Sequence, residues 1–209
     1  MIDDINHLPW MNIGNFGAYI QMAYLEKIKD RFKKNIIALE IGSAYGGAVE
    51  MMAKSLKGKG KAYGYDTFEG HPEDLSDSPK SSEARAMDIW YDKFGKEKLG
   101  YDYQRRVLDN QGLGNAILVK GRVNKHSFDD IEKAHLIMFD MDLIKPTIVA
   151  YNALKNKIVR GGYLFFHDAL PPNHLPLICK FVYDEVLKDK TLEVDREFIS
   201  SHLTILEKK

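Results

Sequence analysis

The sequence has little of several features that mark particular classes of protein. It contains one cysteine, Cys179, so no disulfide can form within the chain and we expect a reducing compartment. The 30 Lys and Arg residues balance 30 Asp and Glu residues, and this zero net charge argues against a nucleic acid or an anionic membrane as partner. No apolar run approaches the roughly 20 residues of a membrane-spanning helix. The first residues are acidic and lack the basic and apolar regions of a secretion signal. We therefore expect a cytoplasmic protein.

What is present is a regular alternation of predicted strands and helices. The 209 residues, 44% of them hydrophobic, suit one α/β domain with a full core. Short apolar runs bounded by turn residues indicate buried strands, and helical spacing separates most of them. This order predicts a doubly wound, mostly parallel, seven-stranded sheet with helices on both faces. The predicted strands are 35–41, 61–65, 116–119, 135–139, 162–166, 191–198 and 202–206, the last two forming a hairpin.

The helices and the domain organisation follow from the same pattern. We expect one domain over residues 1–209, with an N-terminal helical segment (1–34) and an inserted cap or lid region (70–112) in which Trp90 and Tyr91 could line a pocket. The predicted helices are 16–33, 48–56, a short one at 127–130, one from Pro146 to Gly161-Gly162, and 175–187. Cys179 lies among apolar residues of the last helix and is expected to be a small buried side chain.

Acidic residues follow two of the predicted strands directly. Asp140 and Asp142 come after strand 135–139, and Asp168 follows strand 162–166 after His167. Parallel strands end at one edge of a sheet, so these carboxylates should gather there and repel one another. A divalent cation with oxygen ligands would neutralise them. Each acid alone could equally be a helix cap or a turn former.

A glycine loop and a second acid occupy the ends of the first two strands. Residues 40–47, Glu-Ile-Gly-Ser-Ala-Tyr-Gly-Gly, join the first strand to its helix, and Asp66 ends the second strand. Glycine permits a close approach of backbone to ligand, and an acid after the second strand can accept hydrogen bonds from ribose hydroxyls. The Gly-x-Gly-x-x-Gly spacing of a dinucleotide site is absent. The pattern favours a cofactor that contains ribose.

These segments resemble a known family. Glu40-x-Gly42-x-x-x-Gly46-Gly47 is similar to the first motif of class I S-adenosylmethionine-dependent methyltransferases, which have a Rossmann-like fold. Residues 65–72, Tyr-Asp-Thr-Phe-Glu-Gly-His-Pro, and 140–143, Asp-Met-Asp-Leu, resemble segments of the macrocin-type O-methyltransferases that act on macrolide and aminocoumarin sugars. The likeness extends over residues 36 to about 185. Met141 and His167 differ from the glycine and the second aspartate that are usual in that family.

The resemblance implies roles for individual residues. Contacts with S-adenosylmethionine would come from Glu40, Gly42, Ser43, Gly46, Asp66, Thr67 and Phe68, with Asp66 on the ribose and Thr67 and Phe68 beside the adenine. Mg²⁺ or another divalent cation would be held by Asp140 and Asp168. Asp142 would be the catalytic base, since residues two apart in an extended segment face the same side. His167 could be a further ligand, a rival base or an orienting residue.

Together these features predict a metal-dependent O-methyltransferase. Its partner would be a small molecule, expected to contain a sugar, whose hydroxyl accepts the methyl group. The sequence is also compatible with a homo-oligomer. A coordinated hydroxyl loses its proton more readily, and a nearby carboxylate can accept that proton. Two alternatives remain: a nicotinamide-dependent oxidoreductase on a similar sheet, and a cofactor-binding module without turnover.

Overall fold

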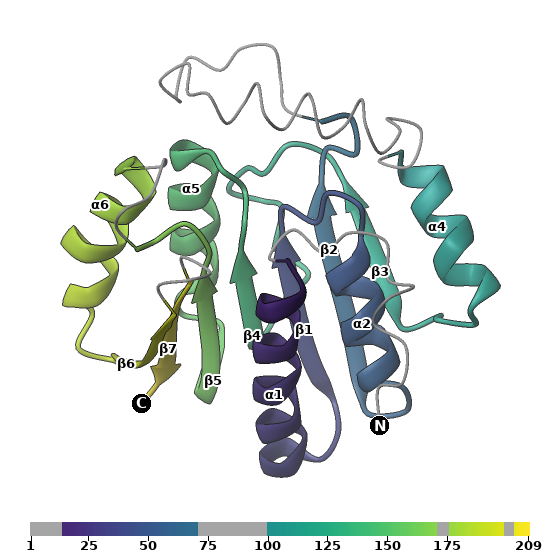
Figure 1. Ribbon diagram of the computed structural model, residues 1–209, viewed down its shortest axis with the longest axis horizontal. Coiled ribbons are helices and arrows are strands. Elements are labelled where there is room, and N and C mark those ends of the chain that lie inside the picture. The colour runs from purple at the N-terminus through teal and green to yellow at the C-terminus, as the bar shows by residue number, and fades with distance from the viewer. Residues whose placement is uncertain (1–13, 71–99, 171–175, 199–202) are drawn as a thin grey trace.

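The computed structural model describes residues 14–70, 100–170, 176–198 and 203–209 (Figure 1). Strands and helices alternate along the chain, as the sequence predicts. The helices are α1 (Gly14–Phe32), α2 (Gly47–Ser55), α4 (Tyr101–Asn110), α5 (Ile144–Leu154), α6 (Pro176–Asp184) and the 3₁₀ turn η3 (Val186–Lys188). The strands are β1 (Ile36–Ile41), β2 (Gly60–Asp66), β3 (Ala116–Lys120), β4 (Ala134–Phe139), β5 (Ile158–Phe166), β6 (Leu192–Phe198) and β7 (Leu203–Lys208).

The strands form one seven-stranded sheet in the order β3-β2-β1-β4-β5-β7-β6. The first five in this order are parallel, and β7 pairs antiparallel with both β5 and β6. The predicted doubly wound, mostly parallel sheet and its closing hairpin are confirmed. The chain moves outward from β1 in one direction through β2 and β3 and then restarts beside β1 with β4. In such sheets ligands bind outside the carboxyl ends of the strands at this reversal.

Two hydrophobic clusters cover the two faces of the sheet. Helices α1, α2 and α4 contribute to one of them, and Figure 1 shows α1 and α2 in front of the strands. Helices α5 and α6 contribute to the other, where the rings of Phe139 and Phe166 stack with centroids 4.6 Å apart. Both of these phenylalanines are almost wholly buried, and each is the last residue of its strand. The core therefore reaches the carboxyl edge and fixes the residues that follow.

Two predicted helix boundaries are wrong. Helix α5 ends at Leu154, and Gly161-Gly162 lie inside β5 rather than at the end of a helix. Gly161 has φ +75° at an irregularity in the pairing of β4 with β5, and its carbonyl accepts a hydrogen bond of 2.6 Å from Nη1 of Arg31 on α1. The glycines thus permit a distortion within a strand. Pro146 is the third residue of α5, not the first.

The short helix predicted at residues 127–130 is a set of turns. The Asn124 side chain accepts a hydrogen bond from the backbone N–H of His126, and Ser127 Oγ accepts one from the N–H of Asn124. These local bonds compete with helix formation.

Part of the predicted cap region lies outside the described residues, including Trp90 and Tyr91. Its C-terminal part forms α4, whose partly buried Tyr101 packs against the cluster of α1 and α2. Among the described helices, none is both long and apolar enough to cross a membrane.

Candidate active site

The glycine loop after β1 packs directly against the segment that follows β4. Gly42 has φ +92°, and a Cβ atom at this position would clash with the carbonyl oxygen of Asp140. The Gly42 N–H donates a hydrogen bond of 2.8 Å to the Tyr65 carbonyl of β2. Only glycine meets both requirements without strain. The loop predicted to bind a cofactor is therefore in contact with the backbone of a predicted metal ligand.

The carboxylate of Asp66 joins the glycine loop to the turn after β2. Its Oδ2 accepts a 2.9 Å hydrogen bond from the Ala44 N–H, and its Oδ1 accepts a 2.8 Å bond from the Phe68 N–H. Ala44 and Phe68 both have positive φ, +39° and +58°, which costs energy for residues other than glycine. The Thr67 hydroxyl lies 3.3 Å from the same Oδ1 of Asp66. Asp66 holds two strained loops at the sheet edge, and its ribose contact stays a prediction.

Other predicted cofactor residues have structural partners. The Thr67 hydroxyl donates a 2.9 Å hydrogen bond to the Gly70 carbonyl. The Phe68 ring is 4% exposed and packs edge-to-face against Tyr101 of α4, with centroids 5.4 Å apart. Ser43 is buried in the loop. Phe68 therefore anchors α4 to the turn after β2, and the predicted adenine contact remains untested.

Gln104 of α4 contacts the glycine loop, a role that the sequence does not indicate. It is 3% exposed, and its Nε2 donates a hydrogen bond to the Ala44 carbonyl. Gly46, at φ +73° before α2, leaves the space that Gln104 fills, because a Cβ there would clash with Gln104 Oε1. A glutamine on an otherwise polar helix carries no signal of burial. Its position emerges only when α4 packs beside the loop.

Glu40 is a buried acid at the end of β1. It is 1% exposed, and burial raises its pKa well above the ordinary value, with the carboxylates of Asp140 and Asp66 adding to the effect. Its Oε2 has no hydrogen-bond partner among the described residues. A buried acceptor of this kind calls for a donor. An amine or hydroxyl of a bound ligand would supply one, in agreement with the predicted role of Glu40.

Three of the predicted metal ligands come together at the ends of β4 and β5. The register pairs Phe139 with Phe166, so the residues after these strands start at the same level. One ligand atom each from Asp140, His167 and Asp168 lies within 4.8 Å of the other two. His167 Nδ1 is 2.7 Å from Asp140 Oδ1 and 3.1 Å from Asp168 Oδ2.

The histidine offsets part of the negative charge of this cluster. Burial acts to lower the pKa of His167, but the charges and acceptor oxygens of Asp140 and Asp168 outweigh it and hold that pKa well above the usual value. Without a metal, an imidazolium would therefore offset one of the two carboxylate charges. A divalent cation would offset both and would displace the proton.

The geometry of Asp142 differs from the expected one. Asp142 has φ +59°, so the segment after β4 is not extended there and the rule that residues two apart share a side does not apply. Asp142 is half-exposed and is not one of the three clustered residues. Its assignment as base stays a prediction. Asp168 also has positive φ, +57°, and its carbonyl accepts a 3.2 Å hydrogen bond from the buried Cys179 of α6.

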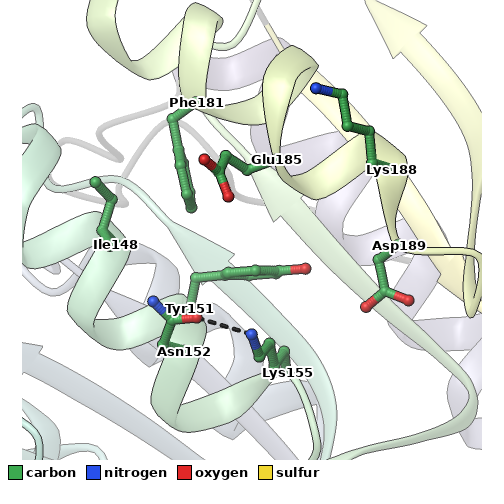
Figure 2. Close-up of a pocket in the computed structure, with 8 residues that line it drawn as sticks. All are labelled: Ile148, Tyr151, Asn152, Lys155, Phe181, Glu185, Lys188 and Asp189. Carbon is green, nitrogen blue, oxygen red and sulfur yellow. Dashed lines mark hydrogen bonds between the residues drawn. The ribbon is translucent and has the colours of Figure 1, made fainter.

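A separate hollow of about 400 Å³ lies between α5 and α6 (Figure 2). Aromatic rings of Tyr151 and Phe181 face it, with charged groups at its margin. None of the predicted site residues lines it. The Tyr151 hydroxyl is no candidate base, because burial raises its pKa to about 12.

The arrangement is that of a methyltransferase fold. No protein-family model and no curated protein matches the sequence. Among solved structures, the O-methyltransferase NovP is similar with a TM-score of 0.67 and 17% identity, over 92% of this chain and 79% of NovP. CalS11, the calicheamicin methyltransferase, is similar with a TM-score of 0.66 and 18% identity, over 97% of this chain and 83% of CalS11. A Streptococcus mutans protein in complex with SAH is similar with a TM-score of 0.56 and 13% identity, over 91% of this chain and 97% of that protein.

These likenesses confirm the predicted Rossmann-like fold of the class I methyltransferases. More particularly, structures of sugar-pathway O-methyltransferases share this fold, as the sequence motifs suggest: a second CalS11 structure describes it as a TDP-rhamnose 3′-O-methyltransferase. At identities below 20%, the likeness extends to the fold and not to the chemistry.

Proposed function

We propose that the protein is a metal-dependent O-methyltransferase that transfers the methyl group of S-adenosylmethionine to a hydroxyl of a small, sugar-containing metabolite. The observation that carries this proposal is the contact of Gly42 with Asp140. It joins a loop suited to a nucleoside cofactor to a cluster suited to a cation. A methyl donor and an activated hydroxyl must lie side by side for in-line transfer.

The cofactor half of the site would use residues from the ends of β1 and β2. Asp66 follows β2 at the carboxyl edge beside the glycine loop, which is the position from which an acid can accept hydrogen bonds from ribose hydroxyls. Glu40 presents a buried oxygen with no partner among the described residues, which a donor of the methionine portion would satisfy. The SAH complex of a protein with this fold supports the choice of cofactor.

The metal half of the site fits a divalent cation. Asp140 Oδ2 is buried without a hydrogen-bond partner in the described part of the chain, and the cluster supplies two carboxylates and an imidazole. Asp140, His167 and Asp168 would hold the ion. When bound, the cation would lower the pKa of an acceptor hydroxyl and orient it. Asp142, on the adjoining turn, would accept the proton, with His167 the rival for that role.

The acceptor class rests on the sugar-pathway motifs and on the name of CalS11 as a TDP-rhamnose 3′-O-methyltransferase. The test is to screen nucleoside-diphosphate deoxysugars for formation of S-adenosylhomocysteine, with added metal and with a chelator. We expect turnover that requires metal and is lost in Asp140→Asn. Surface Asp109→Asn is the matched control and should keep full turnover, because the exposed Asp109 carboxylate pairs with Arg105 on the same helix and is not a proposed site residue.

Three outcomes would contradict the proposal in different ways. Calorimetric binding of NAD in place of S-adenosylmethionine would indicate an oxidoreductase. Tight cofactor binding with no turnover across the screen would favour a binding module. Turnover that a chelator leaves unchanged would retain the transferase and remove the metal.

A further inference from the structure

Two separations within the cluster match those between neighbouring ligand positions around one metal ion. Ligands at about 2.1 Å in an octahedral site lie roughly 3.0 Å from one another. The separations of 2.7 Å and 3.1 Å between His167 Nδ1 and the two carboxylates are close to this value. Both separations are ion-pair distances, although Nδ1 has no hydrogen bond of standard geometry among the described residues. The imidazole is therefore held beside the two acids by charge, and Nδ1 would lose its proton to coordinate an ion.

A second observation also indicates a ligand at this position. The Asp140 side chain is 3% exposed, and its Oδ2 has no hydrogen-bond partner in the described chain. A buried carboxylate oxygen left in this state is costly unless a cation or a donor completes it.

Backbone hydrogen bonds hold two of the three residues, Asp140 and His167, in place before any ion binds. The Asp140 N–H donates to the Ile41 carbonyl at 2.9 Å, and the His167 N–H donates to the Phe139 carbonyl at 3.1 Å. These bonds continue the sheet into the two ligand segments. His167 Nδ1 is therefore a fixed part of the ligand set, and the ion meets one nitrogen and two or more oxygens.

The ligand type sets the metal preference. Mg²⁺ favours oxygen ligands and retains its waters, whereas imidazole suits the divalent ions of the first transition row. We infer that His167 makes this site selective for a transition-metal dication, of the Mn²⁺ to Zn²⁺ series, over Mg²⁺. The inference rests on the proposed function, in that it assigns the identity of the ion which that function requires.

The test is metal binding to the whole protein, without cofactor or acceptor. Mn²⁺, Co²⁺ and Mg²⁺ are titrated by calorimetry into the wild type, into His167→Asp, and into His126→Asp as control. His126 is an exposed histidine beside Asp129, so His126→Asp makes the same substitution at a position away from the metal cluster. We expect His167→Asp to reduce the preference for Co²⁺ over Mg²⁺ by roughly tenfold or more, since the imidazole nitrogen is replaced by a carboxylate oxygen. The control should leave the preference unchanged.

A spectroscopic measurement on the wild type keeps the inference testable if His167→Asp does not fold. Pulsed electron paramagnetic resonance of the bound Mn²⁺ should show modulation from a coordinated imidazole nitrogen. An equal metal preference in wild type and folded His167→Asp, or Mn²⁺ bound without nitrogen coupling, would overturn the inference and leave a magnesium-dependent transferase intact. If none of the three ions binds, the metal half of the proposed function fails as well. Metal-independent methyl transfer would then be the surviving activity.

Discussion

Two histidines occupy opposite ends of the same pair of strands, and their surroundings favour the neutral form of one and the cationic form of the other. His135, near the start of β4, is 2% exposed, and burial together with Lys133 lowers its pKa to about 4. Its Nδ1 accepts a 3.1 Å hydrogen bond from the Ile37 N–H, and Phe32 packs edge-to-face against its ring. His167, after β5, has a raised pKa because two carboxylates adjoin it.

The buried polar groups at the two ends of the sheet differ in whether the protein itself supplies their hydrogen-bond partners. At the amino end, the buried polar group is neutral, hydrogen-bonded and packed by an aromatic ring. At the carboxyl edge, Glu40 and Asp140 each retain an oxygen with no hydrogen-bond partner among the described residues. Burial alone does not distinguish the two ends. The distinction is that one end is complete within the protein and the other requires a ligand.

The largest expected effect tests whether the carboxyl edge performs proton transfer. Asp142→Asn should keep cofactor and metal binding and reduce turnover by roughly 10²–10⁴-fold, because a general base is removed. Steady-state rates and calorimetry on the same variant provide the measurement. If excess metal restores the rate, Asp142 is a ligand. A nearly active Asp142→Asn beside an inactive His167→Ala, assayed at saturating metal, would transfer the role to His167.

The next effect tests the amino end, and it concerns stability. The neutral form of His135 is the one favoured in the folded state, so stability is retained above pH 6.5 and is lost as the pH falls towards 4. The full loss is on the order of a few kcal/mol, because the unfolded state binds the proton far more tightly than the folded state. His135→Gln retains an acceptor for the Ile37 N–H but does not titrate. Urea unfolding from pH 7 to 4 should show a smaller decline in this variant than in the wild type.

Exposed His126 provides the matched control for that experiment. His126→Gln should follow the wild-type pH dependence, since this residue lies at the surface. Identical curves for wild type and His135→Gln would mean that the amino end does not destabilise the protein in acid, and the contrast between the two histidines would fail.

A third prediction concerns Asp66, which holds two loops together and is also expected to contact the cofactor. Asp66→Asn retains an oxygen for one of the two backbone N–H groups and should preserve the fold, as measured by circular dichroism. Binding of S-adenosylmethionine should weaken by roughly 1.5–3 kcal/mol, the scale of a charge-assisted hydrogen bond. Unchanged affinity in a folded variant would confine Asp66 to its loop-holding role. Asp109→Asn again serves as the surface control.

The smallest effect concerns the hydrogen bond from Cys179 to the Asp168 carbonyl. This bond supports a residue with φ +57° in the metal cluster, and a thiol is a weak donor. Cys179→Ala should weaken metal binding by about 0.5–1.5 kcal/mol, the net contribution of one ordinary hydrogen bond. Cys179→Ser should restore it, since a hydroxyl donates better than a thiol. Equal weakening in both variants would attribute the effect to packing of α6.

The sequence was sufficient for the sheet and for the clustering of three ligands. Apolar runs that end in acid locate the carboxyl ends of buried parallel strands, and parallel pairing brings those ends together. The error at Gly161-Gly162 has a physical cause. The same residue that ends helices also allows an irregularity within a strand, and only the contact with Arg31 distinguishes the two.

Long-range packing decides the parts that the sequence could not predict. Gln104 reaches the glycine loop because α4 lies beside it, and the two residues joined by its hydrogen bond to Ala44 are 60 positions apart. The positive φ of Asp142 has no local signal either, since aspartate tolerates the left-handed region without requiring it. Patterns in the sequence describe strands and their ends; they do not describe the path of the backbone beyond those ends.

The contact between Gly42 and the Asp140 carbonyl has a consequence for engineering. The loop after β1 and the segment after β4 cannot be exchanged with those of another enzyme one at a time. A donor loop with any side chain at position 42 would push the Asp140 backbone away and carry the Asp140 carboxylate with it. A graft that changes cofactor preference must therefore redesign both segments together, or it alters the cation site as an unintended result.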